Sequence, residues 1–371
     1  MSVLQRAVER HRAQDLEEAR RLYRQVLDQD PQDFDAQHLL GVVEQRLGDP
    51  ATAIRHFHAA LTLQPDAPNV MFNYSTALVK QERWVDLYTW TAHALQIQPD
   101  FDYALTNLRL AVETLLYDET TAVPAHLMPA DDTVVFYLNK AGLGDNLLYS
   151  TLPELFHRAG KKFYVSQASF CRNPEIYDLV WGRNPYVLGR SKFFPNAGIG
   201  ALLDGRFSAH SHILNWLTRA EVLHGFEAGN DLPQLHYQPR RHAELAGKVL
   251  VDLASKTVTY TPELMADYLE FTLSRFHYDR DDVVFIRFKS SEIGEDNLAD
   301  AGGRTYTVQS IFDYCDAISS ARALITVHSG ANSMAAAIKG DNPSPAIHCA
   351  VDANHFNQKC YIWKNIDYSI V

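Results

Sequence analysis

The hydrophobic positions in the first third of the chain have the spacing of amphipathic helices, and the whole pattern repeats every 34 residues. Pro31, Pro65 and Pro99 each close one helical stretch. Small residues are needed where two helices of a hairpin touch, and larger ones fill the space between hairpins. Aligning the prolines brings three such sets into register: Ala19, Ala53 and Leu87; Tyr23, Phe57 and Thr91; Val26, Ala60 and Ala94. The pattern predicts three helical repeats and a closing helix at about residues 102–117.

This periodicity resembles the tetratricopeptide repeat (TPR). The second repeat carries most of the family positions, namely Leu40, Gly41, Ala53, Phe57, Ala60 and Pro65. The resemblance implies an α-solenoid over residues 1–118 whose concave face binds a protein or peptide; an unrelated helical bundle is the alternative.

Asn73 and Asn107 occupy equivalent positions on the first helices of two successive repeats. An amide side chain can both donate to and accept from an extended peptide backbone. The pair resembles the asparagine ladder of O-GlcNAc transferases, which implies peptide binding by these two residues. Two ordinary polar surface residues are the alternative.

The spacing of the hydrophobic positions changes after residue 118. Residues 119–132 contain two prolines and an acidic pair, which predicts a linker. The runs "TVVFYL" (133–138) and "KKFYVSQ" (161–167) predict buried parallel strands around a helix at 146–159. The pattern restarts near residue 248, where Thr261 is the predicted N-cap of a long helix. The later predicted strands are "KVLVDLA", "DDVVFIRF", "RALITVHS" and "SPAIHCAV", and further helices are predicted at 308–321 and 330–340.

The predicted fold class is therefore α + α/β. An N-terminal TPR solenoid at 1–118 and a linker at 119–132 precede two α/β domains, at 133–240 and 241–371. Between the two domains lies a predicted helix at 212–227.

Composition and charge exclude some classes of partner and leave the predicted domains unchanged. The formal net charge is −11, and residues 1–119 hold 11 Lys and Arg against 18 Asp and Glu, which argues against nucleic acid as a partner. No apolar run approaches the length of a membrane span, and the first residues lack the apolar core of a secretory signal, so we expect a cytoplasmic protein. The four widely spaced cysteines predict buried thiols.

Two glycine turns carry the candidate chemistry. In the first, Gly142 and Gly144 precede Asp145 after a predicted strand, but Leu147 replaces the third glycine of the dinucleotide fingerprint. Asp145 stands where α/β sheets bind ligands; capping of its own helix is the alternative. In the second turn, Ser329, Gly330, Ala331 and Asn332 open a helix, a place that favours a diphosphate or, alternatively, a tightly packed helix start.

Together, "GLGDNLLYSTLPELF", "HILNWLTRAEVLHG" and "SIFDYCDAISSARALITVHSGANSMAAAIKG" resemble glycosyltransferase family 9, the ADP-heptose:lipopolysaccharide heptosyltransferases, over about residues 132–371. The resemblance implies the GT-B fold with its two Rossmann-like domains, no metal or other cofactor, and a nucleotide-diphosphate sugar donor. It implies that Asp145 is the catalytic base and that Ser329 and Gly330 bind the donor diphosphate. The other glycine-turn residues Gly142, Gly144, Ala331 and Asn332 are further candidates for binding the donor phosphates. Lys256 matches the family's phosphate-binding lysine or is an exposed surface lysine.

The chain departs from the family pattern at two places. Family members usually carry Asp before the Ser/Thr-Gly pair and His three residues after its glycine, whereas this chain has His328 and Ser333. His328 is a candidate for binding a phosphate or sugar hydroxyl, or else a packed histidine. The departures leave the donor's identity open.

The leading hypothesis is an inverting, metal-independent glycosyltransferase whose TPR region recruits a protein acceptor. The alternative is an interaction scaffold or nucleotide sensor with a catalytically degenerate GT-B domain. A third reading is an enzyme similar to polysaccharide pyruvyl transferases, in which "GDNLL" also follows a strand.

Overall fold

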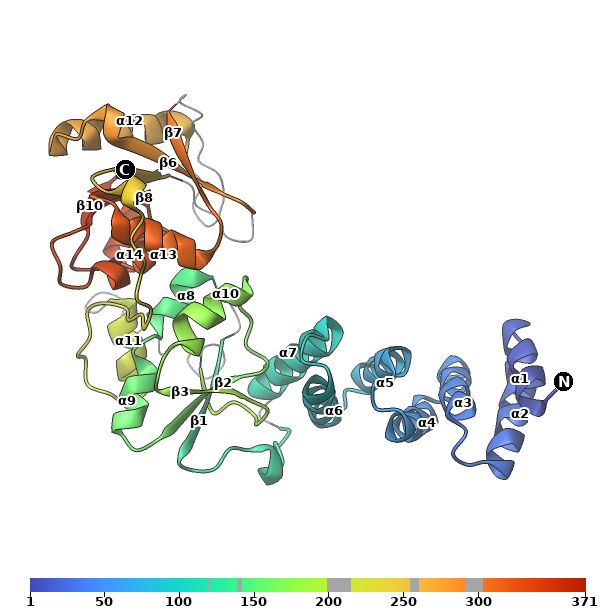
Figure 1. The fold of residues 1–371 in the computed structure, drawn as a ribbon. Helices are drawn as coiled ribbons and strands as arrows, with labels where there is room; N and C mark the ends of the chain where they lie inside the picture. The colour runs from blue at the N-terminus through green and yellow to red at the C-terminus, as the bar shows by residue number, and fades with distance from the viewer. Residues whose placement is uncertain (119, 139–141, 199–214, 254–259, 291–302) are drawn as a thin grey trace. The chain divides into compact units, whose positions relative to one another are not determined.

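The computed structural model describes residues 1–118, 120–138, 142–198, 215–253, 260–290 and 303–371, and Figure 1 draws it as a ribbon. These residues form two compact units. Unit 1 contains Met1–Met128 and Lys192–Phe194; unit 2 contains Pro129–Ser191 and Pro195–Val371.

Unit 1 is a row of antiparallel helices whose boundaries repeat with the period of the sequence. The second helix of each repeat is 14 residues long and ends just before the proline-containing turn. Asp33, Asp49 and Ser2 cap three of the helices through their side chains. The helices are α1 (Val3–Arg12), α2 (Leu16–Gln29), α3 (Phe34–Arg46), α4 (Pro50–Leu63), α5 (Pro68–Lys80), α6 (Trp84–Ile97) and α7 (Asp102–Tyr117).

The positions that the sequence brought into register form the core of unit 1. Ala19, Ala53 and Leu87 are fully buried, as are their larger neighbours Tyr23 and Phe57. Neighbouring helices pack closely because a glycine faces an aromatic ring. A Cβ atom added at Gly41 on α3 would lie 2.6 Å from Cε1 of Phe57 on α4. The predicted closing helix at 102–117 is confirmed by α7.

Unit 1 extends beyond the predicted solenoid boundary at residue 118. It runs to Met128 and takes in Lys192–Phe194, a short segment from far along the chain. The Tyr88 hydroxyl on α6 donates to the Lys192 carbonyl at 2.5 Å. The Phe194 ring is buried with its centroid 5.3 Å from that of Tyr88.

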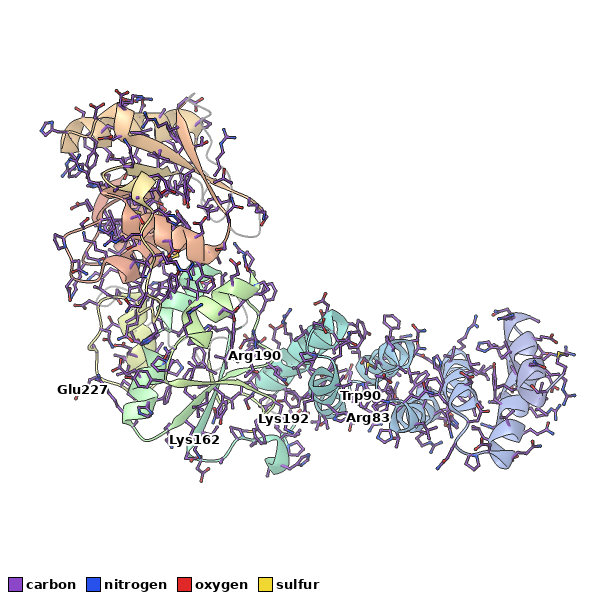
Figure 2. The ribbon with its side chains drawn as sticks, viewed as in Figure 1. Arg83, Trp90, Lys162, Arg190, Lys192 and Glu227 are labelled. Atoms are coloured by element: carbon purple, nitrogen blue, oxygen red, sulfur yellow. The ribbon has the colours of Figure 1, made fainter. Side chains whose placement is uncertain are left out.

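Unit 2 contains two parallel sheets, as the α/β pattern predicted. The first has the strand order β3-β2-β1-β4, with β1 (Thr133–Tyr137), β2 (Lys162–Ser166), β3 (Val187–Ser191) and β4 (Ala197–Gly198). In the register of β1 and β2, Thr133 lies opposite Lys162. The Lys162 ammonium, labelled in Figure 2, pairs with Asp132 at 2.7 Å beside this end of the ladder.

The second sheet has six parallel strands in the order β10-β9-β8-β5-β6-β7. Its central strands are buried on both faces because side chains alternate between two cores. Val249 and Val251 of β5 (Val249–Asp252) pack with α12 (Pro262–Phe276), whereas Leu250 packs in the cluster that contains α13 (Ile311–Ser320) and α14 (Gly330–Lys339). The strands are β5 (Val249–Asp252), β6 (Val283–Phe288), β7 (Arg304–Val308), β8 (Ala323–Val327), β9 (Ala346–Val351) and β10 (Asp367–Ile370).

The helices of unit 2 differ from the sequence prediction, which missed the two short helices α10 (Pro174–Tyr177) and α15 (Ala353–Asn357) and placed one helix where there are two. The single helix predicted at 146–159 is two helices that break at residues 149–151, because Pro153 lacks an N–H and its ring excludes a continuous helix through that turn. The predicted N-cap Thr261 is confirmed, since its side chain accepts from the Leu264 N–H. The helices are α8 (Leu143–Leu148), α9 (Leu152–Arg158), α10 (Pro174–Tyr177), α11 (Trp216–Leu223), α12 (Pro262–Phe276), α13 (Ile311–Ser320), α14 (Gly330–Lys339) and α15 (Ala353–Asn357).

Two further expectations need correction. The strands β3, β4, β7 and β10 were not predicted, and all four lie at sheet edges. Of the four predicted buried thiols, three are buried, but Cys171 is only half-buried. The strands of the two sheets fall within the predicted segments 133–240 and 241–371, while the domain boundaries themselves remain predictions.

Candidate functional site

The strand orders of the two sheets indicate where a ligand site is expected. The order of the second sheet is that of the doubly wound fold, with its topological switch point between β5 and β8. In the first sheet the order reverses between β1 and β4. Ligands of such sheets bind outside the carboxyl ends of the strands at the switch point. Both glycine turns lie at such ends, since the first follows β1 and the second follows β8.

The two glycine turns meet, although 186 residues separate Gly144 from Gly330 in the sequence. A Cβ atom added at Gly330 would lie 3.0 Å from the Gly144 nitrogen and 3.0 Å from Cβ of Leu143. A Cβ atom added at Gly144 would lie 3.5 Å from the Gly330 Cα. The absence of a side chain at position 330 therefore allows the start of α14 to pack on α8.

The Asp145 carboxylate lies at this junction with both oxygens engaged. Its Oδ2 accepts a hydrogen bond from the Gly142 N–H at 3.0 Å, which caps α8. Its Oδ1 accepts one from the Tyr361 hydroxyl at 2.5 Å. Burial, together with the adjacent Asp145 charge, raises the pKa of Tyr361 well above its usual value. This hydroxyl therefore stays protonated and is the donor of the hydrogen bond to Asp145.

The second turn is stabilised by its own side chains. The Ser329 Oγ accepts from the Ala331 N–H at 3.2 Å, and the Ser329 N–H donates to Oδ1 of Asn332 at 3.3 Å. Asn332 is fully buried, and its Nδ2 donates to the Tyr361 carbonyl at 3.1 Å. In this state Ser329 and Asn332 cap α14.

His328, just before this turn, is also engaged. It is 4% exposed, and its Nε2 lies 2.7 Å from the Cys360 carbonyl. Burial lowers the pKa of His328, so the ring is neutral near pH 7 and donates from Nε2 to that carbonyl.

A single segment, residues 358–363, makes most of these contacts and is called the strap segment below. Besides the contacts of Cys360 and Tyr361, the Gln358 carbonyl accepts from Arg219 at 2.7 Å, and Nε1 of Trp363 donates to Ser333 at 3.1 Å. Lys359 and Tyr361 have φ values of 52° and 50°, in the left-handed region that side chains other than glycine rarely adopt. Such a backbone persists only where surrounding contacts hold it.

Sequence reasoning missed the strap segment. The stretch "QKCYIW" has no glycine turn, no helix cap and no charge pattern. Its role comes from contacts with residues that are distant in the sequence, and local patterns carry no information about these.

Three of the residues predicted to bind the donor have different outcomes. Lys256 lies outside the described residues. Gly142 and Ala331 donate their backbone N–H groups to Asp145 and Ser329, so these two N–H groups are occupied by the protein's own side chains.

Within the described residues, no group of three or more His, Cys, Asp or Glu side chains is arranged to hold a metal ion. Among the helices described, none has both the length and the apolar character needed to cross a membrane.

Comparison with known proteins bears on unit 1. Two overlapping stretches, residues 4–68 and 38–86, match the family model described as tetratricopeptide repeat. The N-terminal region is a TPR region. No curated protein matches the chain.

Several solved structures are similar to part of the chain at low sequence identity. MamA is 18% identical over 31% of this chain, with a TM-score of 0.29, and this chain spans 62% of the MamA chain. The first TPR of Spaghetti (RPAP3), bound to an HSP90 peptide, is 17% identical over 30% of this chain and 92% of its own, with a TM-score of 0.27. The Yersinia enterocolitica chaperone SycD, in complex with a YopD peptide, is 14% identical over 29% of this chain and 88% of its own, also with a TM-score of 0.27.

The two asparagines predicted to bind peptide have unlike surroundings in the TPR region. Asn73 on α5 is half-buried, with its Nδ2 3.1 Å from Nε2 of His38 on α3. Asn107 on α7 is 7% exposed, and its Nδ2 is buried with no hydrogen-bond partner among the described residues. A buried amide without a partner costs free energy, so Asn107 is the one with hydrogen-bonding capacity to spare.

Proposed function

We propose that unit 2 is an inverting glycosyltransferase that uses a nucleotide-diphosphate sugar, and that the TPR region recruits its protein or peptide acceptor. One observation carries the proposal. Two glycine turns, far apart in the sequence, meet at the carboxyl ends of parallel strands, with the Asp145 carboxylate at their junction.

The chemistry assigned to this junction is a single displacement. The acceptor hydroxyl replaces the Tyr361 hydroxyl at Oδ1 of Asp145 and gives up its proton to that oxygen. The acceptor oxygen forms its bond to the anomeric carbon as the bond from that carbon to the donor diphosphate breaks, which inverts the configuration. The N–H groups at the start of α14 stabilise the charge that grows on the departing diphosphate. This step requires the Ser329 side chain to release its cap.

The TPR region supplies the acceptor in this proposal. Solenoids of such repeats form extended concave binding surfaces. Asn73 and Asn107 occupy equivalent positions in two successive repeats, and an amide side chain can both donate to and accept from an extended peptide backbone.

A second candidate function is a TPR scaffold whose unit 2 binds a nucleotide without transferring a sugar. The strap segment favours it, because the Tyr361 hydroxyl is already hydrogen-bonded to Oδ1 of Asp145. The Cys360 carbonyl is likewise hydrogen-bonded to Nε2 of His328. Both functions predict nucleotide binding, and they differ in turnover.

The test compares wild type with Asp145→Asn, using exposed Asp341→Asn as the matched control. Thermal shift with ADP, GDP, UDP, CMP and CDP identifies the nucleotide; a ligand at 100 times its dissociation constant stabilises the bound unit by about 2.7 kcal/mol. Transfer is then measured as release of that nucleotide from its sugar conjugate in the presence of acceptor. We expect Asp145→Asn to bind the nucleotide like wild type and to lose transfer by roughly 10²- to 10⁴-fold.

Three outcomes are informative. Equal transfer by Asp145→Asn and wild type excludes Asp145 as the base. Nucleotide binding without transfer by wild type supports the scaffold function. Binding of none of the nucleotides contradicts both functions for unit 2.

A further inference from the structure

A pocket of about 670 Å³ in unit 2 has none of the glycine-turn residues in its lining. The segment 236–242 forms one wall, the start of α13 forms another, and Arg183 completes the lining. The volume falls in the range of small-molecule sites. This pocket is called the arginine pocket below, after Arg183 and Arg240 in its lining.

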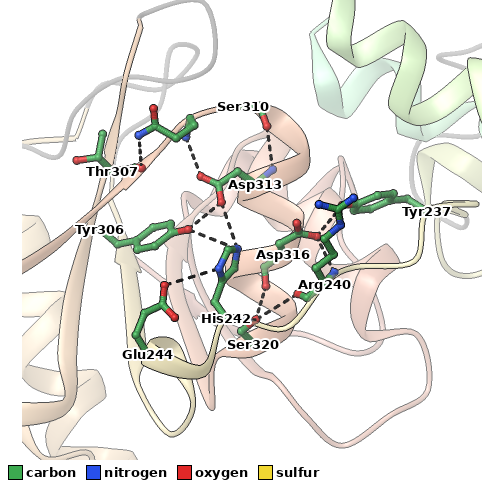
Figure 3. A network of polar contacts seen from close by, with 11 residues as sticks. Tyr237, Arg240, His242, Glu244, Tyr306, Thr307, Ser310, Asp313, Asp316 and Ser320 are labelled. Atoms are coloured by element: carbon green, nitrogen blue, oxygen red, sulfur yellow. Dashed lines mark hydrogen bonds and ion pairs between the residues drawn. The ribbon is translucent and has the colours of Figure 1, made fainter.

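The wall formed by segment 236–242 is held firmly on α13 (Figure 3). Oδ1 of Asp316 accepts hydrogen bonds from the Arg240 N–H at 2.8 Å and from the Tyr237 hydroxyl at 2.7 Å. The Ser320 hydroxyl accepts from the His242 N–H at 2.8 Å. These bonds fix the backbone of Arg240 and leave its guanidinium group outside them.

The carboxylates of the pocket are largely used within the protein. Asp313 accepts from the Tyr306 hydroxyl at 2.7 Å through Oδ1 and from the Gln309 N–H at 2.8 Å through Oδ2. Its Oδ1 also lies 3.3 Å from Nε2 of His242 (Figure 3). Asp316 is engaged as well, through the main-chain N–H of Arg240. Neither carboxylate forms an ion pair with a guanidinium group of the pocket among the described residues.

The two guanidinium groups, by contrast, form no ion pair with any residue that the structure describes. The Arg183 guanidinium carbon lies 4.8 Å from the ring centroid of Phe312 and 5.3 Å from that of Tyr237. Stacking of this kind orients the group while leaving its N–H donors available. Nε2 of His236, in the same lining, is buried without a hydrogen-bond partner among the described residues.

Charge and hydrogen bonding thus point to an anionic ligand. Two arginines, two histidines and two aspartates line this pocket, and both carboxylates accept hydrogen bonds from the protein's own donors. The N–H donors of the two guanidinium groups are left for an anion of the ligand. The start of α13 adds little, because the Ile311 N–H is already bonded to Glu175 and the Asp313 N–H to Ser310.

We propose that the arginine pocket binds a small molecule that carries a phosphate group. A guanidinium group can donate two parallel hydrogen bonds to one oxyanion. A phosphate has enough oxygens for two such groups and carries a second charge near neutral pH, whereas a carboxylate has two oxygens and one charge. The proposal is independent of sugar transfer at Asp145.

The test titrates inorganic phosphate into the full chain by calorimetry at constant ionic strength, with acetate as the carboxylate probe. The variants are Arg183→Gln, Arg240→Gln and the double variant. Arg304→Gln is the control, because Arg304 is an exposed arginine outside the pocket lining. Since Arg183 and Arg240 are exposed, we expect all variants to keep the wild-type melting temperature.

We expect phosphate to bind wild type and Arg304→Gln equally, each single variant about tenfold more weakly, and the double variant not measurably. Unchanged phosphate affinity in the double variant, or no binding to wild type, overturns the proposal. Acetate binding as tight as phosphate overturns the assignment of a phosphate ligand.

Discussion

At the scale of single residues, Asp145 caps its own helix, which sequence reasoning offered as the alternative to a role in chemistry. Its Oδ2 caps α8, while its Oδ1 turns toward Tyr361 and the second turn. A carboxylate has two oxygens, so capping by one does not exclude chemistry at the other. The helix cap could be predicted, because Asp145 stands near the start of a helix. The hydrogen bond from Tyr361 could not, because 216 residues separate the two in the sequence.

Tyr361→Phe removes the hydroxyl and leaves Oδ1 of Asp145 without that donor. A hydrogen bond to a charged group contributes about 1.5 to 3 kcal/mol. We expect the free energy of unfolding of unit 2 to fall by about this amount, as measured by denaturant titration. Tyr164→Phe is the control, because the Tyr164 hydroxyl makes no hydrogen bond with any residue that the structure describes, and it should change stability by less than about 0.5 kcal/mol. An equal loss in both variants would refute a stabilising role for the Tyr361 hydroxyl.

His348 makes the stability of unit 2 depend on pH. It is 3% exposed, and burial lowers its pKa to about 4. The unfolded chain has a histidine pKa of about 6.5 and therefore binds more protons between these values. The stability contributed by neutral His348 is complete above pH 6.5 and is lost as the pH falls toward 4.

We expect wild type to lose about 2 kcal/mol more than His348→Gln between pH 7 and pH 4.5, by denaturant titration at each pH. The glutamine keeps a polar partner for the Tyr278 hydroxyl, which lies 2.9 Å from Nε2 of His348. Exposed His157→Gln is the control and should follow wild type. Parallel pH profiles for wild type and His348→Gln would contradict the assignment.

At the scale of helices and strands, the strands that are buried on both faces of a sheet could be predicted from the sequence, and the edge strands could not. Strands such as β5 and β8 are buried throughout and read as continuous apolar runs. The edge strands β3, β7 and β10 alternate or are mostly exposed, so their sequences look like loops. The repeats were predictable for a related reason, since each repeat buries the same positions against its neighbour.

Gly41→Ala tests the close contact between α3 and α4. The added methyl group meets the buried Phe57 ring at 2.6 Å, and overpacking of a core typically costs about 1 to 3 kcal/mol. We expect the unfolding of unit 1 to shift to lower temperature. In the double variant Gly41→Ala/Phe57→Leu, the smaller side chain relieves the clash, so the double variant should lose less stability than the sum of the single variants. Strict additivity would show that the contact does not limit packing.

At the scale of the whole molecule, the chain has two compact units with separate cores. The core of unit 1 includes Ala19, Tyr23 and Leu40, whereas the sheets of unit 2 pack around clusters of their own. Units with separate cores need not unfold together.

We expect two transitions in differential scanning calorimetry of the full chain. Gly41→Ala should lower one transition and Tyr361→Phe the other, because each substitution lies in a different unit. The bound nucleotide should raise only the transition that Tyr361→Phe lowers. A single transition that both substitutions lower equally would show instead that the units unfold as one.

The position of the strap segment has a consequence for synthesis on the ribosome. Tyr361 follows Asp145 by 216 residues, which corresponds to about 10 to 40 s of translation at typical rates. During that interval the first glycine turn has neither the second turn nor its tyrosine partner. The nascent chain therefore carries an incomplete junction until its last sheet is made, and a ribosome that stalls before residue 358 leaves Asp145 without the Tyr361 hydrogen bond.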